Sequence, residues 1–373
     1  MKYKICLIAH YGEDYLDYRL SFLKYLRKFG RDSFAIVPRD VYFNEINKTE
    51  FPVYFYKYSR SWKFFFDIIK TYSFFKKTLI KEKPNLVFTY KFFPNLLGIY
   101  VADKVGVKLK VATVAGLGFL ENRKKYILIR IVFRIYMKVL TKADYIIVQN
   151  RDDKILFEKY HSINKVVLTN GSGVNKDMFL NIDHLPSDFK HKDLREINFL
   201  FCSRIIKEKG ILELIDAFKS LLSQKQNLRL TIAGWFDNKN IEKKVLESIK
   251  GCEAISFLGY AKDVQKIILQ SDCVVLPSYY PEGVPRSLTE SLALSRPVIT
   301  TNHKGCKETC IDGVNGYLVK PRDVSDLQEK LLSFVNLNKK EIDNMKSASL
   351  ELFNNKFEEK KVFKTIVDKI FDK

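Results

Sequence analysis

The chain has 373 residues, of which 46% are hydrophobic and 29% are charged. This length predicts two domains with sizeable cores, and the hydrophobic fraction argues against an intrinsically disordered protein. The formal net charge of +21 predicts an anionic partner, for which an anionic membrane leaflet and nucleic acid are both candidates. A lysine-rich proteome would explain the number of lysines, but it explains their clustering less well.

Apolar strands alternate with helical stretches along the chain, which is typical of parallel sheets covered on both faces. A polar segment without periodicity, residues 181–193, predicts a linker between domains at 1–184 and 185–355. A last helix is expected near 358–371, after a break near Asn354 and Asn355. The predicted strands lie near residues 5–9, 34–37, 53–56, 86–89, 109–114, 145–148, 166–168, 197–202, 228–233, 255–257, 273–276, 298–300 and 317–319.

The positive charge is concentrated in the first half. Residues 1–185 hold 33 Lys/Arg and 17 Asp/Glu, a net charge of +16, whereas the remainder carries +5. No apolar run there or elsewhere is long and charge-free enough to span a bilayer, and the apolar start is too short for a signal peptide. We therefore expect a cytoplasmic protein. The six cysteines are scattered, and the Cys306-x-x-x-Cys310 spacing lacks the second pair that a zinc site requires.

Two segments of the first half combine aromatic, apolar and basic residues. Residues 51–83 interleave lysines with aromatic side chains around Trp62, and residues 123–142 read RKKYILIRIVFRIYMKVLTK. Both patterns fit a helix lying in a membrane interface, and the second equally fits a buried crossover helix with a solvated basic edge. On a helix, the second segment has one face with Ile127, Arg130, Arg134 and Lys138, and another with Leu128, Ile131, Ile135 and Val139.

The residues best suited to chemistry gather in the second half. Arg204 follows a predicted strand, and Lys209 lies five residues later at a helix start. A guanidinium and an ammonium group can neutralise a leaving diphosphate, a task that other enzymes give to a divalent metal. The chain contains no Asp-x-Asp pair for such a metal, so we expect none. Glu282 and Glu290 lie eight positions apart, and such carboxylates can bind sugar and ribose hydroxyls.

This arrangement resembles the E-x7-E signature of retaining glycosyltransferases of family 4, in which an arginine and a lysine bind the diphosphate. The resemblance covers nearly the whole chain, although its specific motifs lie mainly in residues 200–320. It implies the GT-B fold, an α/β architecture of two Rossmann-like domains whose parallel sheets face a central cleft. The first domain would bind the acceptor and the second the nucleotide sugar. The C-terminal helix, residues 356–373, would pack back on the first domain.

The same resemblance assigns roles to individual residues. It makes Glu282, Arg204 and Lys209 catalytic, and it places Gly116 and Gly118 in a loop facing the donor. This chain has Thr113-Val-Ala-Gly where some members carry a catalytic histidine, which puts a histidine-assisted step in doubt. His10 either faces the cleft or is a turn residue without a role, and Arg19 either meets an acceptor phosphate or caps local structure. The expected donor-binding residues are Glu290, Gly283, Val284, Ser287, Leu258 and Gly259.

The motifs around His10, Arg19, Gly116 and residues 278–285 are similar to those of bacterial enzymes that extend undecaprenyl-diphosphate-linked sugars for O-antigen, capsule or N-glycan assembly. The resemblance implies transfer of a sugar without metal or cofactor. The first candidate is an N-acetylhexosamine donated by UDP-GalNAc or UDP-GlcNAc. The acceptor would be a lipid-linked saccharide at the anionic inner face of the cytoplasmic membrane. One alternative is a UDP-sugar epimerase of the same fold. Another is a basic nucleic-acid-binding protein, although no nucleic-acid-binding motif accompanies the charge, so nucleic acid is not an expected partner.

Overall fold

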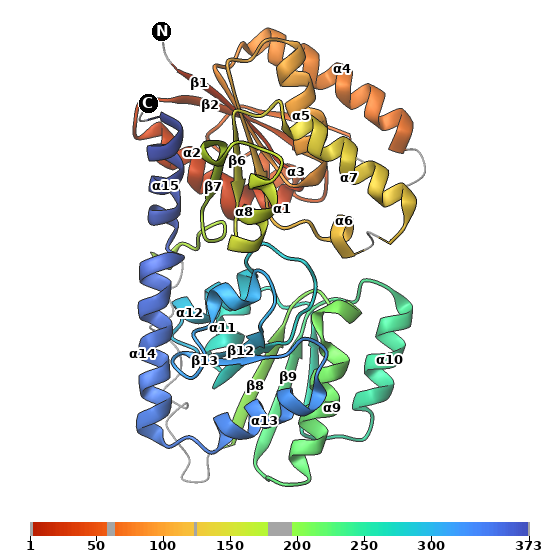
Figure 1. The fold of residues 1–373 in the computed structure, drawn as a ribbon, viewed down its shortest axis with the longest axis vertical. Helices are drawn as coiled ribbons and strands as arrows, with labels where there is room; N and C mark the ends of the chain where they lie inside the picture. Colours follow the sequence, from red (N-terminus) through yellow and green to blue (C-terminus); the bar gives the residue numbers. More distant parts are fainter. Residues whose placement is uncertain (1–2, 58–63, 123–124, 178–195, 372–373) are drawn as a thin grey trace. The chain divides into compact units, whose positions relative to one another are not determined.

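The computed structural model describes residues 3–57, 64–122, 125–177 and 196–371. Its internal contacts divide the chain into two compact units (Figure 1). Unit 1 comprises residues 1–172 and 362–373, and unit 2 comprises residues 173–361. The sequence placed the boundary at 184/185, but the expected linker and Trp62 lie outside the described residues.

Unit 1 is built on one parallel sheet of seven strands in the order β3-β2-β1-β4-β5-β6-β7. Alternate residues of each strand point to opposite faces, so Ile5 and Leu7 join one core cluster while Cys6 and Ile8 join another. Both faces are thus apolar, and the expected strands of this half are confirmed. The strands are β1 Lys4–Ile8, β2 Asp32–Pro38, β3 Val53–Tyr56, β4 Leu86–Tyr90, β5 Leu109–Val114, β6 Tyr145–Val148 and β7 Val166–Leu168.

Helices cover both faces of this sheet (Figure 1). One face packs against α2 Leu20–Arg27 and the terminal helix α15 Glu359–Phe371, where the rings of Phe22 and Phe363 lie 5.0 Å apart. The chain end therefore completes the core of unit 1. The other face packs against α4 Phe64–Glu82, α5 Phe92–Lys104 and α7 Ile127–Leu140. Shorter helices are α1 Gly12–Asp14, α3 Phe43–Ile46, α6 Phe119–Asn122 and α8 Arg151–Glu158, with a π-helical turn at Tyr15–Arg19.

Helix α7 packs on the sheet through a face that the sequence did not single out. Neither of its two predicted faces forms the core contact, and of the expected apolar stripe only Val139 is partly buried. The buried face is a third one, made of Phe133, Tyr136, Met137 and Leu140. The helix is thus a crossover helix that keeps a second, apolar face in solvent.

Unit 2 contains a parallel sheet of six strands in the order β10-β9-β8-β11-β12-β13 around a single core cluster. Its strands also confirm those expected from the sequence. They are β8 Ile197–Cys202, β9 Leu228–Ala233, β10 Ile255–Gly259, β11 Cys273–Leu276, β12 Val298–Thr301 and β13 Gly316–Val319. The helices are α9 Ile211–Leu222, α10 Lys239–Ile249, α11 Val264–Leu269, α12 Arg286–Ala293, α13 Val324–Val335 and α14 Lys339–Lys356.

The helix break expected near Asn354 and Asn355 lies slightly later, at Phe357. Helix α14 continues through both residues and ends at Lys356. The chain leaves the helix where Phe357 enters the core and its carbonyl oxygen accepts a hydrogen bond from the Val174 amide at 3.0 Å. Tertiary burial of one aromatic ring thus sets the break. None of the helices in the described ranges combines the length and apolarity needed to cross a bilayer.

Candidate active site

The predicted donor-site residues lie at the carboxyl ends of the strands of unit 2. Arg204 and Lys209 follow β8, and Glu282 follows β11, which pairs directly with β8. The strand order reverses between these two strands. Open parallel sheets bind ligands at such a reversal, because the two loops there diverge to opposite sides of the sheet and leave a crevice.

Lys209 and Glu282 form an ion pair across this point. The Lys209 Nζ donates to Glu282 Oε2 at 2.5 Å, and the two side chains are only 10% and 14% exposed. The Ser278 hydroxyl donates to the other carboxylate oxygen, Oε1, at 2.8 Å. Lys209 is therefore a largely buried partner of Glu282 and not a surface charge at a strand end. Tertiary folding places the predicted catalytic cation beside the predicted catalytic carboxylate.

Backbone contacts clamp the two loops together. The Tyr279 amide donates to the Glu208 carbonyl at 2.9 Å, and the Tyr279 hydroxyl donates to the Lys207 carbonyl at 3.1 Å. Gly210 has φ +76°, and a Cβ at this position would collide with the Pro277 carbonyl oxygen. The loops approach so closely that only glycine fits, so the Lys209–Glu282 pair has a rigid frame.

Gly305 holds the other side of the carboxylate loop. Its φ is +77°, and an added Cβ would collide with the carbonyl oxygen of Gly283. This contact supports Gly283 and Val284, the expected donor-binding residues that follow Glu282. Three positions on from Gly305, Glu308 is buried and accepts a hydrogen bond from Lys356 Nζ at 2.9 Å. That pairing with α14 gives Glu308 a structural role.

Arg204 has a different partner. Its Nη1 donates to Asp237 Oδ1 at 3.2 Å, and both side chains are partly exposed. Burial raises the pKa of Tyr280, and the nearby Arg204 guanidinium offsets part of that rise. Arg204 thus lies beside the loop that carries Glu282, on its solvent-accessible side. The sequence did not predict the contribution of Asp237, because 33 positions separate it from its partner.

Glu290 is a buried carboxylate on α12, not the exposed helix residue that its sequence context alone would suggest. Arg286 Nε, one turn earlier, donates to Glu290 Oε1 at 2.5 Å. Burial and then the charge of Glu290 raise the pKa of Cys202 to about 12, which places Glu290 near the end of β8. Ser287 is partly buried in the first turn of the same helix. Their donor-binding roles stay predictions.

An exposed apolar edge follows β9 and β10. Leu258 is 52% exposed, and Gly259 closes the strand with φ +70°. Beside them the rings of Trp235 and Tyr260 meet edge to face at 5.9 Å, and both are about half exposed. Rings and an exposed leucine can pack against a planar base. No motif marks Trp235 or Tyr260 in the sequence, so only the fold joins them to the expected base-binding segment.

In unit 1, one predicted acceptor residue, Arg19, belongs to a buried charged cluster. The Arg19 guanidinium is buried, lies 3.6 Å over the Tyr90 ring and donates to Asp14 Oδ1 at 3.2 Å. The Lys91 Nζ lies 3.2 Å from the same oxygen. Burial alone would raise the pKa of Asp14, but Arg19 and Lys91 together lower it to about 2. This environment favours the structural interpretation of Arg19 over direct contact with a phosphate.

Lys91 is the cation of this cluster that reaches solvent, since its side chain is 35% exposed. It sits at the carboxyl end of β4 with φ +68°, a strained conformation for a residue other than glycine. His10 is buried after the neighbouring β1, and Gly116 and Gly118 follow β5 with φ of +84° and +50°. These residues share the carboxyl edge of the sheet. The sequence missed Lys91 and Asp14, because backbone strain and burial leave no motif.

The expectation that no metal takes part is not tested. Within the described residues, no group of three or more His, Cys, Asp and Glu side chains is placed to hold a metal ion.

Comparison with known proteins identifies similar sequences. Residues 187–350 match the family model described as "Glycosyl transferases group 1". The chain is 24% identical over 356 residues, 93% of both chains, to the N,N'-diacetylbacillosaminyl-diphospho-undecaprenol alpha-1,3-N-acetylgalactosaminyltransferase of Campylobacter jejuni. It is 29% identical to the capsular polysaccharide biosynthesis glycosyltransferase CapM of Staphylococcus aureus, over 69% of this chain and 68% of that one.

Solved structures support the fold. A glycosyltransferase from Rickettsia africae superimposes with a TM-score of 0.78 at 20% identity, covering 98% of this chain and 97% of that one. The HepE protein of Anabaena, solved with UDP and glucose, gives a TM-score of 0.80 at 16% identity over the full length of both chains. The two parallel α/β units therefore form a GT-B fold. Because both sequence relatives are named transferases, the comparisons do not favour the epimerase alternative, and the chain is a glycosyltransferase enzyme.

Proposed function

We propose that the enzyme moves an N-acetylhexosamine from UDP-GalNAc or UDP-GlcNAc onto a lipid-diphosphate-linked saccharide, with retention of configuration. The observation that carries the proposal is the Lys209–Glu282 pair at the strand reversal of unit 2, held at 2.5 Å in a rigid frame. The Campylobacter jejuni relative supports the sugar and the acceptor class, since its name specifies N-acetylgalactosamine and a diphospho-undecaprenol-linked sugar. The choice of UDP and the retaining outcome follow the resemblance to family 4.

The Lys209 ammonium group has hydrogen-bonding capacity that suits a nucleotide sugar. An ammonium group has three donors, and Glu282 uses one of those on Lys209. The other two can bind diphosphate oxygens while Glu282 keeps the cation in place. In this proposal the Glu282 carboxylate orients the transferred sugar by accepting hydrogen bonds from its hydroxyls. Arg204 can add a second positive charge from the solvent side of the loop.

The proposed reaction follows the resemblance to the retaining glycosyltransferases of family 4. The acceptor hydroxyl attacks the anomeric carbon on the face from which the diphosphate leaves. The new carbon–oxygen bond forms as the bond to the diphosphate breaks, and the hydroxyl proton passes to a phosphate oxygen of the donor. Lys209 and Arg204 stabilise the charge that develops on the leaving group, so neither a metal nor another cofactor is required in this scheme.

The acceptor side of the proposal rests on unit 1. His10, Lys91, Gly116 and Gly118 share the carboxyl edge of its sheet, and Lys91 offers a fixed cation to an anionic acceptor. The positive charge of residues 1–185 suits an anionic membrane, which we propose to be the inner face of the cytoplasmic membrane.

Donor turnover tests the proposal. Purified protein is incubated in EDTA with UDP-GalNAc, UDP-GlcNAc, UDP-Glc or UDP-Gal, with and without a lipid-diphosphate-linked sugar, and Glu282→Ala serves as the control. We expect UDP release that needs one donor and the acceptor together, and an α-linked product. Conversion of donor without acceptor would support the epimerase instead. Activity that returns only when a divalent metal replaces EDTA would refute the metal-free scheme.

A further inference from the structure

Helix α7 of unit 1 exposes apolar side chains for which the fold gives no reason. Ile127 and Leu128 are more than 70% exposed, and Ile131 and Ile135 are about half exposed. Single exposed apolar residues are ordinary, but four on one helix form a patch, and such patches mark interaction surfaces.

The arrangement around the helix is regular. At about 100° per residue, Ile131 lies roughly opposite the centre of the buried face, so the apolar patch points directly away from the core. Arg130 and Arg134 lie on one flank, between the buried face and the apolar patch. The helix therefore has three strips in order: core contact, cations, and exposed isoleucine and leucine. Folding of unit 1 requires only the first.

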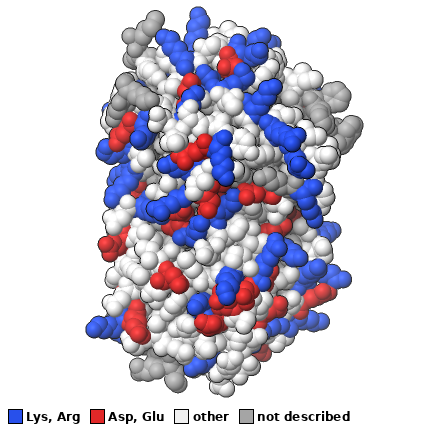
Figure 2. Space-filling view, in the orientation of Figure 1, with Lys and Arg blue, Asp and Glu red and all other residues white. Residues whose placement is uncertain are grey.

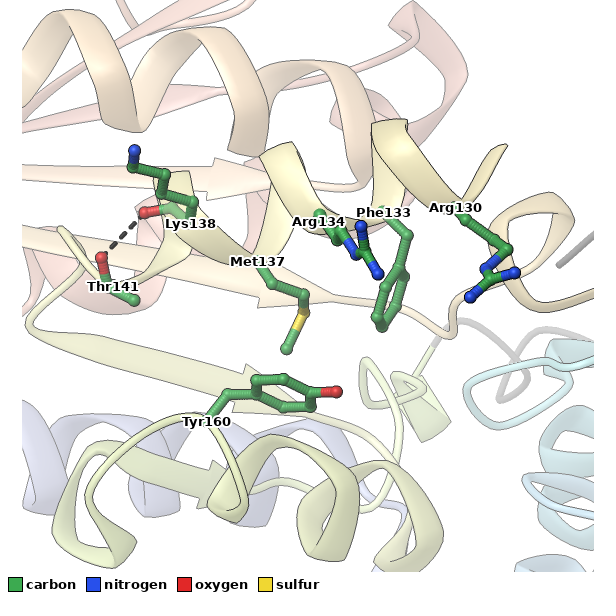
Figure 3. A pocket seen from close by; sticks show the side chains of 7 residues that line it. All are labelled: Arg130, Phe133, Arg134, Met137, Lys138, Thr141 and Tyr160. Atoms are coloured by element: carbon green, nitrogen blue, oxygen red, sulfur yellow. Dashed lines mark hydrogen bonds between the residues drawn. The ribbon is translucent and has the colours of Figure 1, made fainter. Parts of the chain in front are cut away.

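A pocket of about 530 Å³ opens on the cationic flank (Figure 3). In Figure 3, Met137 and Phe133 reach from α7 towards Tyr160, which follows α8, and the guanidinium groups of Arg130 and Arg134 lie on the same side of the helix. The full lining is Arg130, Phe133, Arg134, Met137, Lys138, Thr141 and Tyr160. The pocket thus combines apolar walls with two groups that bind phosphate oxygens in a bidentate manner.

No carboxylate lines this pocket. Within the ranges that the structure describes, Arg130, Arg134 and Lys138 form no ion pair with an acidic side chain. Figure 2 shows basic side chains spread over the part of the view where Figure 1 places α4, α5 and α7, with uncharged surface between them. The positive charge of the arginines and the apolar patch next to it together indicate a partner that is both anionic and apolar.

We propose that this face of α7 lies on an anionic phospholipid bilayer, with Ile127, Leu128, Ile131 and Ile135 in the interface and a lipid phosphate in the pocket between Arg130, Arg134 and Tyr160. A bilayer accommodates both strips, because its acyl region takes the apolar side chains while its phosphates take the cations. This inference rests on the proposed function, because a lipid-linked acceptor requires the enzyme to be at a membrane.

The test is sedimentation of the full chain with phosphatidylcholine vesicles, with and without phosphatidylglycerol. One variant removes the cations (Arg130→Gln/Arg134→Gln) and one the apolar residues (Ile131→Ser/Ile135→Ser). Matched controls in unit 2 change exposed residues of the same kind: Lys243→Gln/Lys244→Gln on α10 and Ile311→Ser/Val314→Ser. Circular dichroism checks that each variant is folded, and Lys209→Ala checks that binding is independent of transfer.

We expect the wild type to bind the mixed vesicles and to be released by salt. The cation variant should lose on the order of 30-fold in partitioning, about fivefold for each charge. The apolar variant should lose about tenfold, and the controls should bind like the wild type. Lys209→Ala should bind the vesicles like the wild type even where sugar transfer is lost. A failure of the proposed function can therefore be distinguished from a failure of the membrane-binding proposal.

Four results would overturn the proposal. The first is that the wild type does not bind anionic vesicles. The second is that the unit 2 controls lose as much binding as the α7 variants, which would show that diffuse charge attraction causes the binding. Normal binding by the apolar variant would show that α7 does not enter the interface. Release by inorganic phosphate, but not by chloride at equal ionic strength, would assign the pocket to a soluble phosphate instead of a lipid.

Discussion

The Lys209–Glu282 pair allows catalysis and stability to be separated by three variants: Lys209→Met, Glu282→Gln and the double variant. The two side chains are about nine-tenths buried and 2.5 Å apart. Removing one partner leaves the other charge buried and uncompensated, which we expect to cost about 3 kcal/mol of unfolding free energy. The double variant removes both charges, so it should cost at most about 1 kcal/mol.

We expect the three variants to rank differently in catalytic activity than in stability. Loss of one group that stabilises developing charge typically lowers kcat by about 10²–10³-fold. Lys209→Met should therefore be slow at saturating donor, and the double variant should be at least as slow although it is nearly as stable as the wild type. A stable but inactive double variant is the signature of a catalytic pair.

Urea unfolding midpoints and single-turnover rates with the preferred UDP-sugar measure the two effects. Circular dichroism confirms that the folded fraction is the same at the assay temperature. If the double variant recovered both stability and turnover, the pair would be a structural ion pair only. That outcome would refute the assignment of Lys209 and Glu282 to the donor site.

Three further predictions follow from single positions. The pKa of Asp14 is lowered from 3.8 to about 2 in the folded state, so its carboxylate stabilises unit 1 above about pH 4 and that contribution is lost as the pH falls towards about 2. In urea unfolding, the advantage of the wild type over Asp14→Asn should thus shrink by about 2 kcal/mol over that range; a constant difference would contradict the ion-pair explanation. Gly305→Ala should cost at least about 3 kcal/mol and weaken UDP binding in calorimetry, whereas Gly313→Ala, with φ +73° but no atom near the added Cβ, should cost only about 1 kcal/mol; equal losses would show that strain, not collision, decides. Of the six cysteines, only Cys252 is partly exposed and burial raises the pKa of the others, so one thiol should react with a disulfide reagent in the native protein and none in Cys252→Ser; a second fast thiol would contradict the burial.

Much of the fold could be read from the sequence for a simple reason. Strands of parallel sheets are buried on both faces, so each appears as a continuous apolar run such as residues 145–148 or 273–276. Those runs do not depend on which strands are neighbours. The break after α14 was misplaced, because polar Asn354 and Asn355 suggest a turn locally, whereas the burial of Phe357 decides where the helix ends.

Within the site, the sequence by itself determined the residue types: two cations after one strand, and two carboxylates around the loop and helix after another. Only the tertiary structure decided which of them meet. The fold pairs Lys209 with Glu282 and Arg204 with Asp237. It also buries Arg19 beside Asp14 and exposes the apolar stripe of α7 to solvent. Periodicity fixes which side chains share a face of an element, but the packing of elements distant in the chain decides which face is buried and which charges become partners.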